Sequence, residues 1–186
     1  GSQIAFREYS SFLGIVNSPW VGLENFRRFF ESPDFWLILK NTLWLNVVNL
    51  VLGFPFPILL ALLLNQVKNK KFKKTVQTVT YAPYFISTVV LVGMLYTMLS
   101  PFSGVVNAVI KALGFEAIHF MGEPGMYVFI YVISGIWQTC GWSAIVYIAA
   151  LASISPDLHE SAIVDGATRL QRILYIDIPG IMPTIV

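Results

Sequence analysis

Long stretches without a charged side chain dominate this sequence. Charged residues are absent from residues 41–67, 75–110 and 124–156. A helix needs about 20 apolar residues to cross the roughly 30 Å hydrocarbon core of a bilayer. Each stretch is long enough, and buried helices of soluble proteins rarely run this far without a charge. The pattern therefore predicts an all-α membrane protein with three complete transmembrane helices, over residues 36–65, 76–99 and 126–154.

Composition agrees with a membrane protein. Of the 186 residues, 56% are hydrophobic and 12% are charged, whereas soluble domains are usually about 25% charged. The net charge of +2 gives no indication of a nucleic-acid partner. The single cysteine, Cys140, lies in an apolar stretch and is interpreted as a small space-filling residue. His119 and His159 lie in separate loops without further ligands, so we expect no metal site.

Glycine and proline predict interruptions. Three such residues fall inside the first span: Gly53, Pro55 and Pro57. Neighbouring helices and water can satisfy the backbone groups that a proline frees in a membrane bundle, so we expect a kink or an offset between two half-helices. Outside the spans, residues 1–35 contain a short amphipathic helix that lies at the membrane interface or packs on the protein. Residues 100–125 contain another short helix, which ends at Gly114.

Positive charge orients the spans. Five lysines crowd the loop at 66–75: Lys68, Lys70, Lys71, Lys73 and Lys74. The loop at 155–180 follows two spans later, so it lies on the same side of the membrane. Because loops rich in lysine and arginine stay in the cytoplasm, we expect both loops inside and residues 1–35 and 100–125 outside. Residues 181–186 begin another apolar run, and we therefore expect a fragment of a larger protein that has helices before and after it.

The loop at 155–180 has the pattern of a helix pair. Ser155 is a good N-cap, Pro156 suits the first helical position, and Gly166 can take a positive φ and end the first helix. A second amphipathic run follows, and Pro179 and Pro183 are expected to close it. A short helix joined by a bend to an anchoring helix suits insertion into a groove of a partner. Any cytoplasmic loop helix can look amphipathic, however, so the pattern alone leaves both interpretations open.

An ordered set of residues in this loop is more specific than its amphipathic pattern. In register, the set is Glu160, Ala162, Asp165, Gly166, Ala167, Gln171, Ile176, Pro179 and Pro183. It resembles the EAA loop of permease subunits of binding-protein-dependent ABC importers, in the sugar-importer version E-A-A-x-x-D-G-A, then I-x-L-P and a later P. The chain departs from that version with Ser161 for alanine and Ile178 for leucine, and with Leu170, Ile173 and Leu174 where aromatic residues are common. These exchanges largely keep size and polarity.

The resemblance extends along nearly the whole chain. SPWVGLENFRRFFESPDFW, followed by Asn41-Thr42, is similar to the external segment of maltose-type sugar permeases. GFPFPILLALLLNQVKNKKFKKTVQTVTYAPYFIS and GIWQTCGWSAIVYIAALASISPDLHESAIVDGA resemble the branch of that family that handles oligosaccharides released from polysaccharides.

The resemblance implies the transmembrane domain of a type I ABC importer in a bacterial plasma membrane. Such an importer has two permease subunits, here of different chains, two cytoplasmic ATPase subunits and an external solute-binding protein. ATP would be bound by the ATPase subunits, so no cofactor is expected on this chain, which is not expected to be an enzyme. The helix at 155–168 would be the coupling helix. The residues expected to couple it to the ATPase are Glu160, Ser161, Ala162, Asp165, Gly166, Ala167 and Pro179.

A carbohydrate path needs aromatic faces for sugar rings and amides or hydroxyls for their hydroxyl groups. Candidates inside the predicted spans are Trp137, Gln138, Trp142, Asn46 and Asn49. Buried polar groups in a membrane usually face other helices or a wet cavity, so the amides are expected to point inward. For each of these residues taken singly, a contact between helices or a place in an interfacial aromatic belt is the favoured interpretation. Trp36 and Trp44 are better interpreted as interfacial belt residues.

The function that fits best is a permease subunit for an ATP-driven carbohydrate importer. One alternative is an importer of the same type for another solute, such as an amino acid or a polyamine. A membrane-embedded enzyme or a receptor is the alternative of another class. Either would show catalytic polar clusters in the spans or a large soluble domain, and the sequence shows no nucleophile–base pair, phosphate loop or metal motif.

Overall fold

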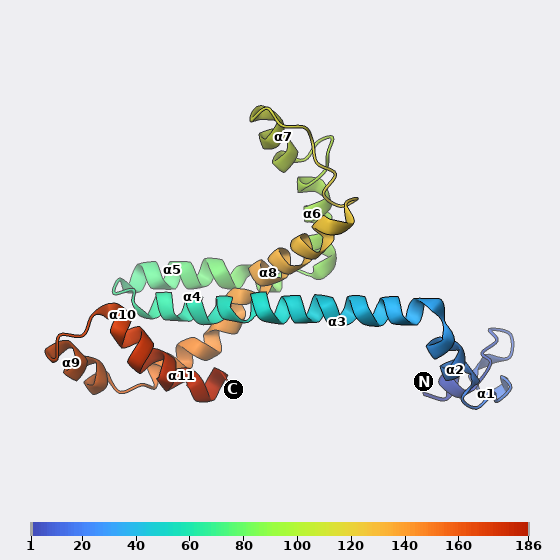
Figure 1. The fold of residues 1–186 in the computed structure, drawn as a ribbon, viewed down its shortest axis with the longest axis horizontal. Helices are drawn as coiled ribbons and strands as arrows, with labels where there is room; N and C mark the ends of the chain where they lie inside the picture. Colours follow the sequence, from blue (N-terminus) through green and yellow to red (C-terminus); the bar gives the residue numbers. More distant parts are fainter. Residues whose placement is uncertain (1, 186) are drawn as a thin grey trace. The chain divides into compact units, whose positions relative to one another are not determined.

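The computed structural model describes residues 2–185 and is helical, with no strand among them (Figure 1). It divides into two compact units, Gly1–Val47 and Val48–Val186. The first unit contains η1 (Ser2–Phe6), α1 (Gly14–Asn17), α2 (Glu24–Glu31) and the start of α3 (Pro33–Gly53). The remaining helices, in chain order, are α4 (Pro55–Asn65), α5 (Lys70–Tyr81), η2 (Ala82–Phe85), α6 (Thr88–Met98), α7 (Val105–Ala112), α8 (Pro124–Ala152), α9 (Pro156–Val164), α10 (Arg169–Arg172), η3 (Ile173–Asp177) and α11 (Ile178–Ile185).

Side chains fold the N-terminal segment back on itself. Arg7 Nη1 donates to the carbonyl oxygens of Val16 and Ser18, each at 2.6 Å. Asn25 of α2 donates to the carbonyl oxygens of Ala5 and Arg7 at 3.1 and 2.9 Å. These bonds satisfy carbonyl groups that no helix or sheet pairs, so the segment has a defined fold despite its short elements.

Among residues 2–185, two helices are long and apolar enough to cross a membrane, Pro33–Asn65 and Gly125–Ala152. The first is the run of α3 and α4. The helical path continues through the segment that contains Pro55 and Pro57. Phe54 has helical backbone angles, and its N–H donates to the carbonyl oxygen of Leu50 at 3.0 Å. Pro55 and Pro57 fall in the first turn of α4, where a proline is best tolerated.

The second predicted span is not one straight helix. The expectation of a helix over 76–99 is wrong in form, because the segments Lys70–Phe85 and Thr88–Met98 are bent by 99°. Pro83 lies in the short η2 turn, Ile86 is extended, and Ser87 caps α6 by accepting the Val90 N–H. The helix also starts earlier than predicted, at Lys70, because Asn69 accepts the N–H groups of Lys71 and Phe72. Most of the expected basic loop at 66–75 is therefore helical. If the bent pair is one span, the described residues contain three.

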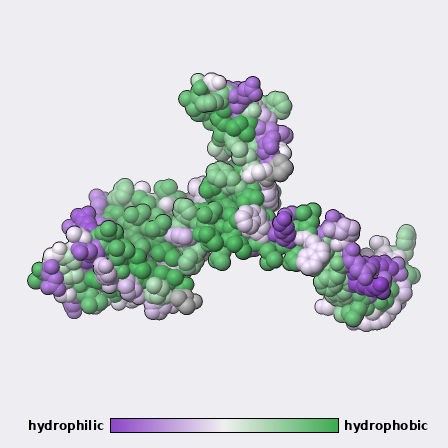
Figure 2. All heavy atoms as spheres, viewed as in Figure 1, coloured by the Kyte–Doolittle hydropathy of each residue, from purple (hydrophilic) through white to green (hydrophobic). Residues whose placement is uncertain are grey.

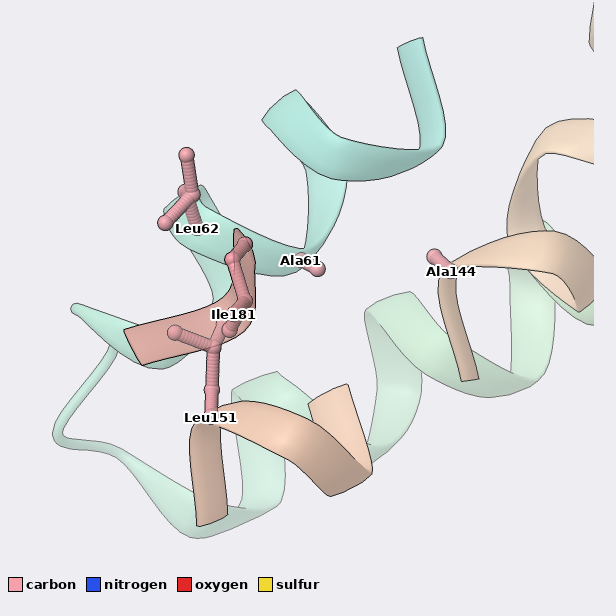
Figure 3. Close-up of a cluster of buried hydrophobic side chains, with 5 residues drawn as sticks. All are labelled: Ala61, Leu62, Ala144, Leu151 and Ile181. Atoms are coloured by element: carbon pink, nitrogen blue, oxygen red, sulfur yellow. The ribbon is translucent and has the colours of Figure 1, made fainter. Parts of the chain in front are cut away.

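The core lies where α4, α8 and α11 meet. It consists of Ala61, Leu62, Ala144, Leu151 and Ile181, all buried (Figure 3). Small residues let helices approach closely in membrane bundles. Gly141 of α8 shows this most clearly, because a Cβ atom there would overlap the backbone carbonyl group of Thr80 in α5.

Outside this core, large apolar side chains face outward. Apolar residues cover much of the visible surface of α4 and α5 (Figure 2). Examples are Leu59, Leu63, Val79, Phe129 and Val146, each about half exposed or more. Soluble proteins rarely leave so much apolar surface uncovered, whereas lipid chains are a suitable neighbour for it.

Asn107 of α7 organises the segment between α6 and α8. It is buried, and its amide nitrogen donates to the carbonyl oxygens of Leu99, Ser100 and Ile118 at 3.0–3.1 Å. Its amide oxygen accepts the Ile118 N–H at 2.8 Å. Gly114 has φ +88°, as expected for the residue that follows the end of α7.

The C-terminal helices form one continuous run from Arg169 to Ile185, through α10, η3 and α11. The expectation that Pro179 and Pro183 close the second helix is wrong, because both lie within α11. The π-helical segment η3 immediately precedes α11, and such a segment changes the hydrogen-bond spacing of a helix. Residues 181–185, expected to begin a further membrane helix, are helical and continue this run as part of α11.

Candidate functional site

Both ends of helix α9 are fixed by capping interactions. At its start, Ser155 Oγ accepts the Asp157 N–H at 3.3 Å, and Pro156 occupies the first turn. At its end, Gly166 has φ +80°. The Gly166 N–H bonds the Ile163 carbonyl at 3.0 Å, and the Ala167 N–H bonds the Ala162 carbonyl at 2.8 Å. This pair of bonds is a Schellman motif, which needs the left-handed conformation that glycine adopts without strain.

The next helix is capped just as firmly. Thr168 and Gln171 form a capping box, in which each side chain accepts the backbone N–H of the other, at 3.3 and 2.8 Å. The bend between α9 and α10 is thus fixed on both sides by hydrogen bonds. The sequence analysis identified the glycine but missed the capping role of Gln171, although the pattern Thr-x-x-Gln could have indicated it.

The outer face of α9 is exposed to solvent. Glu160, Ser161 and Asp165 are exposed, and so are the apolar side chains of Leu158, Ile163 and Val164. Val164 is 86% exposed. Ala162 and Ala167 are partly buried and line a shallow hollow of about 230 Å³ against α10 and η3. Pro179 lies farther along, in α11. Six of the seven predicted coupling residues therefore lie in α9 or in the turn that ends it.

A polar contact that the sequence analysis missed lies behind α9. His159 Nε2 is 3.3 Å from Asp177 Oδ1, and Gln66 Nε2 donates to Asp177 Oδ2 at 3.2 Å. Asp177 is completely buried. Burial raises the pKa of its carboxyl group above the ordinary value, while the nearby His159 and Arg172 oppose that rise. The only signal in the sequence was a single aspartate inside an apolar run.

The predicted carbohydrate-path residues do not gather in one place. Asn49 and Trp142 line a hollow of about 520 Å³, together with Gly53, Phe54, Pro57, Ile136, Thr139, Ser143, Val146 and Tyr147 among others. Trp137 lines a different hollow of about 290 Å³. Asn46 belongs to the first unit, and its amide donates to the Thr42 carbonyl at 2.7 Å within its own helix.

Gln138 has a structural contact. Its amide nitrogen donates to the Ile86 carbonyl oxygen at 2.7 Å. Ile86 is the extended residue at the bend between η2 and α6, so this bond satisfies a carbonyl group that the break leaves free. The alternative interpretation, a contact between helices, describes Gln138 better than an open position in a path.

Trp142 is held by aromatic neighbours from the same bend. Its ring stacks on Tyr84 with centroids 4.6 Å apart and planes 5° apart, and the ring of Phe85 meets it edge-on at 5.7 Å. Trp142 is nevertheless 42% exposed. A rigid aromatic side chain beside polar groups is the kind of surface on which a sugar ring stacks.

Comparison with known proteins identifies the family. Residues 36–186 match the family described as the binding-protein-dependent transport system inner membrane component. The chain belongs to this family. The predicted resemblance to ABC importer permeases is therefore confirmed, and the family is one of membrane transport components.

Two relatives from Bacillus subtilis (strain 168) match over the full length of this chain. It is 45% identical to the polygalacturonan/rhamnogalacturonan transport system permease protein YteP and 39% identical to protein LplB. In each case it covers 58% of the relative. The chain thus spans about three fifths of the length of these curated relatives.

Solved structures agree on the fold. The chain is similar to one in the crystal structure of a bacterial ABC transporter involved in the import of the acidic polysaccharide alginate. The TM-score is 0.88 at 45% identity, covering 98% of this chain and 60% of that one. A second structure holds the bacterial alginate ABC transporter in complex with an alginate pentasaccharide-bound periplasmic protein, with TM-score 0.84 and 47% identity over 88% of this chain and 57% of that one. The expected fold, an all-α type I importer permease, is confirmed.

Proposed function

We propose that this chain forms the membrane core of a permease subunit in an ATP-driven carbohydrate importer. The observation that carries the proposal is the build of α9, an exposed helix that is capped at Ser155 and stopped at Gly166. It follows directly on α8, which is long enough to cross a membrane. When a bound partner displaces such a helix, the displacement can reach the spanning helix as rigid-body motion.

The partners follow from this role. A groove on each cytoplasmic ATPase subunit would receive α9 of one permease, and a second, different permease chain would complete the path. A solute-binding protein would deliver the carbohydrate on the outer side. In this arrangement residues 66–75 and 155–180 face the cytoplasm, and residues 1–35 and 100–125 face outward. The lysines near the start of α5 support this orientation.

The substrate class is proposed from the relatives and from the hollow between α4 and α8. The hollow combines the ring of Trp142 with the neutral polar groups of Asn49 and Ser143, which suits stacking and hydrogen bonding of a sugar. YteP carries the name of a polygalacturonan and rhamnogalacturonan transporter, and one solved relative imports alginate. We therefore propose oligosaccharides as substrates, and those that contain uronic acids are the first to test.

The test uses the full-length protein with its partner subunits and compares two substitutions at Gly166. Valine at this position costs about 1–3 kcal/mol because its side chain disfavours a positive φ. Asparagine tolerates that conformation, and a Cβ atom there would have no described residue within 4 Å apart from its neighbours in the chain. Gly166→Val should reduce association with the ATPase or uptake per ATP hydrolysed, and Gly166→Asn should not. Glu160→Lys, on the exposed face, should act like Gly166→Val by reversing a charge at the docking surface.

Three measurements decide the outcome: pull-down of the ATPase, hydrolysis stimulated by the binding protein, and uptake of labelled oligogalacturonate with a neutral oligosaccharide, an amino acid and a polyamine as competitors. Normal assembly, hydrolysis and uptake by both Gly166→Val and Glu160→Lys would show that α9 is not the coupling element. Competition by the amino acid or the polyamine, but by neither saccharide, would refute the substrate class.

A further inference from the structure

The buried carboxyl group of Asp177 joins three elements that are distant in the sequence. Gln66, which caps the C-terminal end of α4, donates to one of its oxygens. His159, from the middle of α9, lies beside the other. Asp177 itself is the last residue of η3. The contact therefore links α9 both to the anchoring helix and to the end of a membrane span.

The arrangement is costly for a purely structural contact. A fully buried carboxyl group loses its hydration, and well-packed apolar residues usually stabilise such a position at least as well. Hydrogen bonding recovers only part of the loss. His159 Nε2 lies 3.3 Å from Asp177 Oδ1 without hydrogen-bond geometry, and the buried Nε of Arg172 has no hydrogen-bond partner among the described residues. Unsatisfied buried polar groups are uncommon in proteins, and they often mark positions retained for function.

The π-helical segment determines where Asp177 points. Successive residues of an α-helix are about 100° apart around its axis, so the extra residue of a π turn changes the face on which every later side chain lies. Asp177 closes this turn, and it is buried toward α4 and α9 while the following residue continues as regular α11. Single π turns within α-helices occur frequently at functional sites.

We propose that Asp177 is a positioning residue that ties α9 to the end of α4. This inference rests on the proposed function of α9 as the coupling element. Along the chain, α9 is connected to α8 through the turn at 153–155 and to α11 through the bend at 165–168 and α10, and the contact at Asp177 adds a direct link to the end of α4. With it, a displacement of α9 also pulls on Gln66. The hollow proposed for the substrate is lined from both sides, by α8 and by Pro57 of α4, so the tie lets α9 move both walls together.

The experiment removes the charge of the tie and keeps its shape. Asp177→Asn retains an oxygen that can accept from Gln66 but no carboxylate for His159, and His159→Gln removes the other side of the pair. In the full-length transporter, both variants should assemble with the ATPase. Maximal hydrolysis and the half-saturating concentration of the binding protein should also be unchanged. Uptake per ATP hydrolysed should fall, because less of the motion of α9 reaches the walls of the substrate hollow. The double variant should lose no more than the stronger single variant, because the two residues act as one unit.

Matched controls exist outside the site. The chain has two histidines, and His119→Gln makes the same exchange at an exposed position. Glu116→Gln likewise turns an exposed carboxylate into an amide. Both controls should leave uptake per ATP unchanged.

The possible outcomes separate the claims. An unchanged ratio of uptake to hydrolysis in both test variants would overturn the role of Asp177, and so would a loss of protein amount in which the ratio stays normal. If Asp177→Asn does not fold, His159→Gln decides alone, since His159 is partly exposed and its loss leaves the fold less disturbed. Failure of the wild-type complex to import any carbohydrate would overturn the proposed function and this inference with it, and that failure would be seen without any substitution.

Discussion

The close crossing of α5 and α8 gives a sharp prediction about stability. A Cβ atom at Gly141 would overlap the carbonyl oxygen and carbon of Thr80, and it would lie 3.0 Å from the Thr80 Cβ. The first two are backbone atoms, so no side-chain rotation can relieve the overlap. Since carbon atoms pack at about 3.5–4.0 Å, Gly141→Ala requires the two helices to separate by about 1 Å.

The magnitude follows from comparison with a second glycine of the same helix. Overpacking a tight contact costs about 1–3 kcal/mol, whereas replacing a helical glycine by alanine gains up to about 1 kcal/mol of helix propensity. At Gly135 a Cβ atom would find only Asn49 Oδ1, at 3.9 Å. Gly135→Ala should therefore show the propensity gain alone. The difference between the two variants isolates the steric cost, about 1–3 kcal/mol.

The measurement is thermal unfolding of the full-length permease with its partner subunits, in one detergent and at one protein concentration. One kcal/mol corresponds to about 2–4 °C in Tm for 150–250 residues and to less for a larger assembly, so Gly141→Ala should melt below Gly135→Ala by at most about 12 °C. Equal midpoints for the two variants would show that α5 and α8 do not cross as closely as described.

Two further predictions concern orientation and the path. In a protein with Cys140→Ala, an impermeant thiol reagent applied to intact cells should label Ser103→Cys and not Lys68→Cys; the reverse result would refute the proposed orientation. A cysteine at Lys68 leaves the side chain of Asn69, which caps α5, in place. In alanine variants, oligosaccharide uptake should depend on Trp142, which lines the proposed substrate hollow, more than on Trp36. An equal loss at both positions that follows protein amount would indicate packing rather than a role in transport.

Patterns within short stretches of sequence predicted much of the structure. The apolar windows predicted an all-helical membrane fold, and Ser155 and Gly166 marked the limits of α9 because capping depends on residues within one or two turns. The bend after Pro83 was missed, since hydropathy measures how apolar a segment is and not the direction of its axis.

Contacts between distant segments were not predictable in the same way. Gln66 and Asp177 are 111 residues apart, and no local pattern reports that they meet. Gln138 was expected to face a path because buried amides are costly, but the group that satisfies it is the free carbonyl of Ile86, which exists only because of the unforeseen bend. Pro179 and Pro183 were expected to stop a helix, and the π turn before them had no counterpart in the pattern.

The hydrogen bonds of Asn107 have a consequence for recognition. Ordering a flexible loop on binding costs about 1–2 kcal/mol for each backbone residue that becomes fixed. Asn107 secures both ends of the segment from Leu99 to Ile118 before any partner arrives. A protein that binds this segment would therefore find it in one conformation. Binding would cost little conformational entropy in the segment, so a small contact area would suffice for a transient complex.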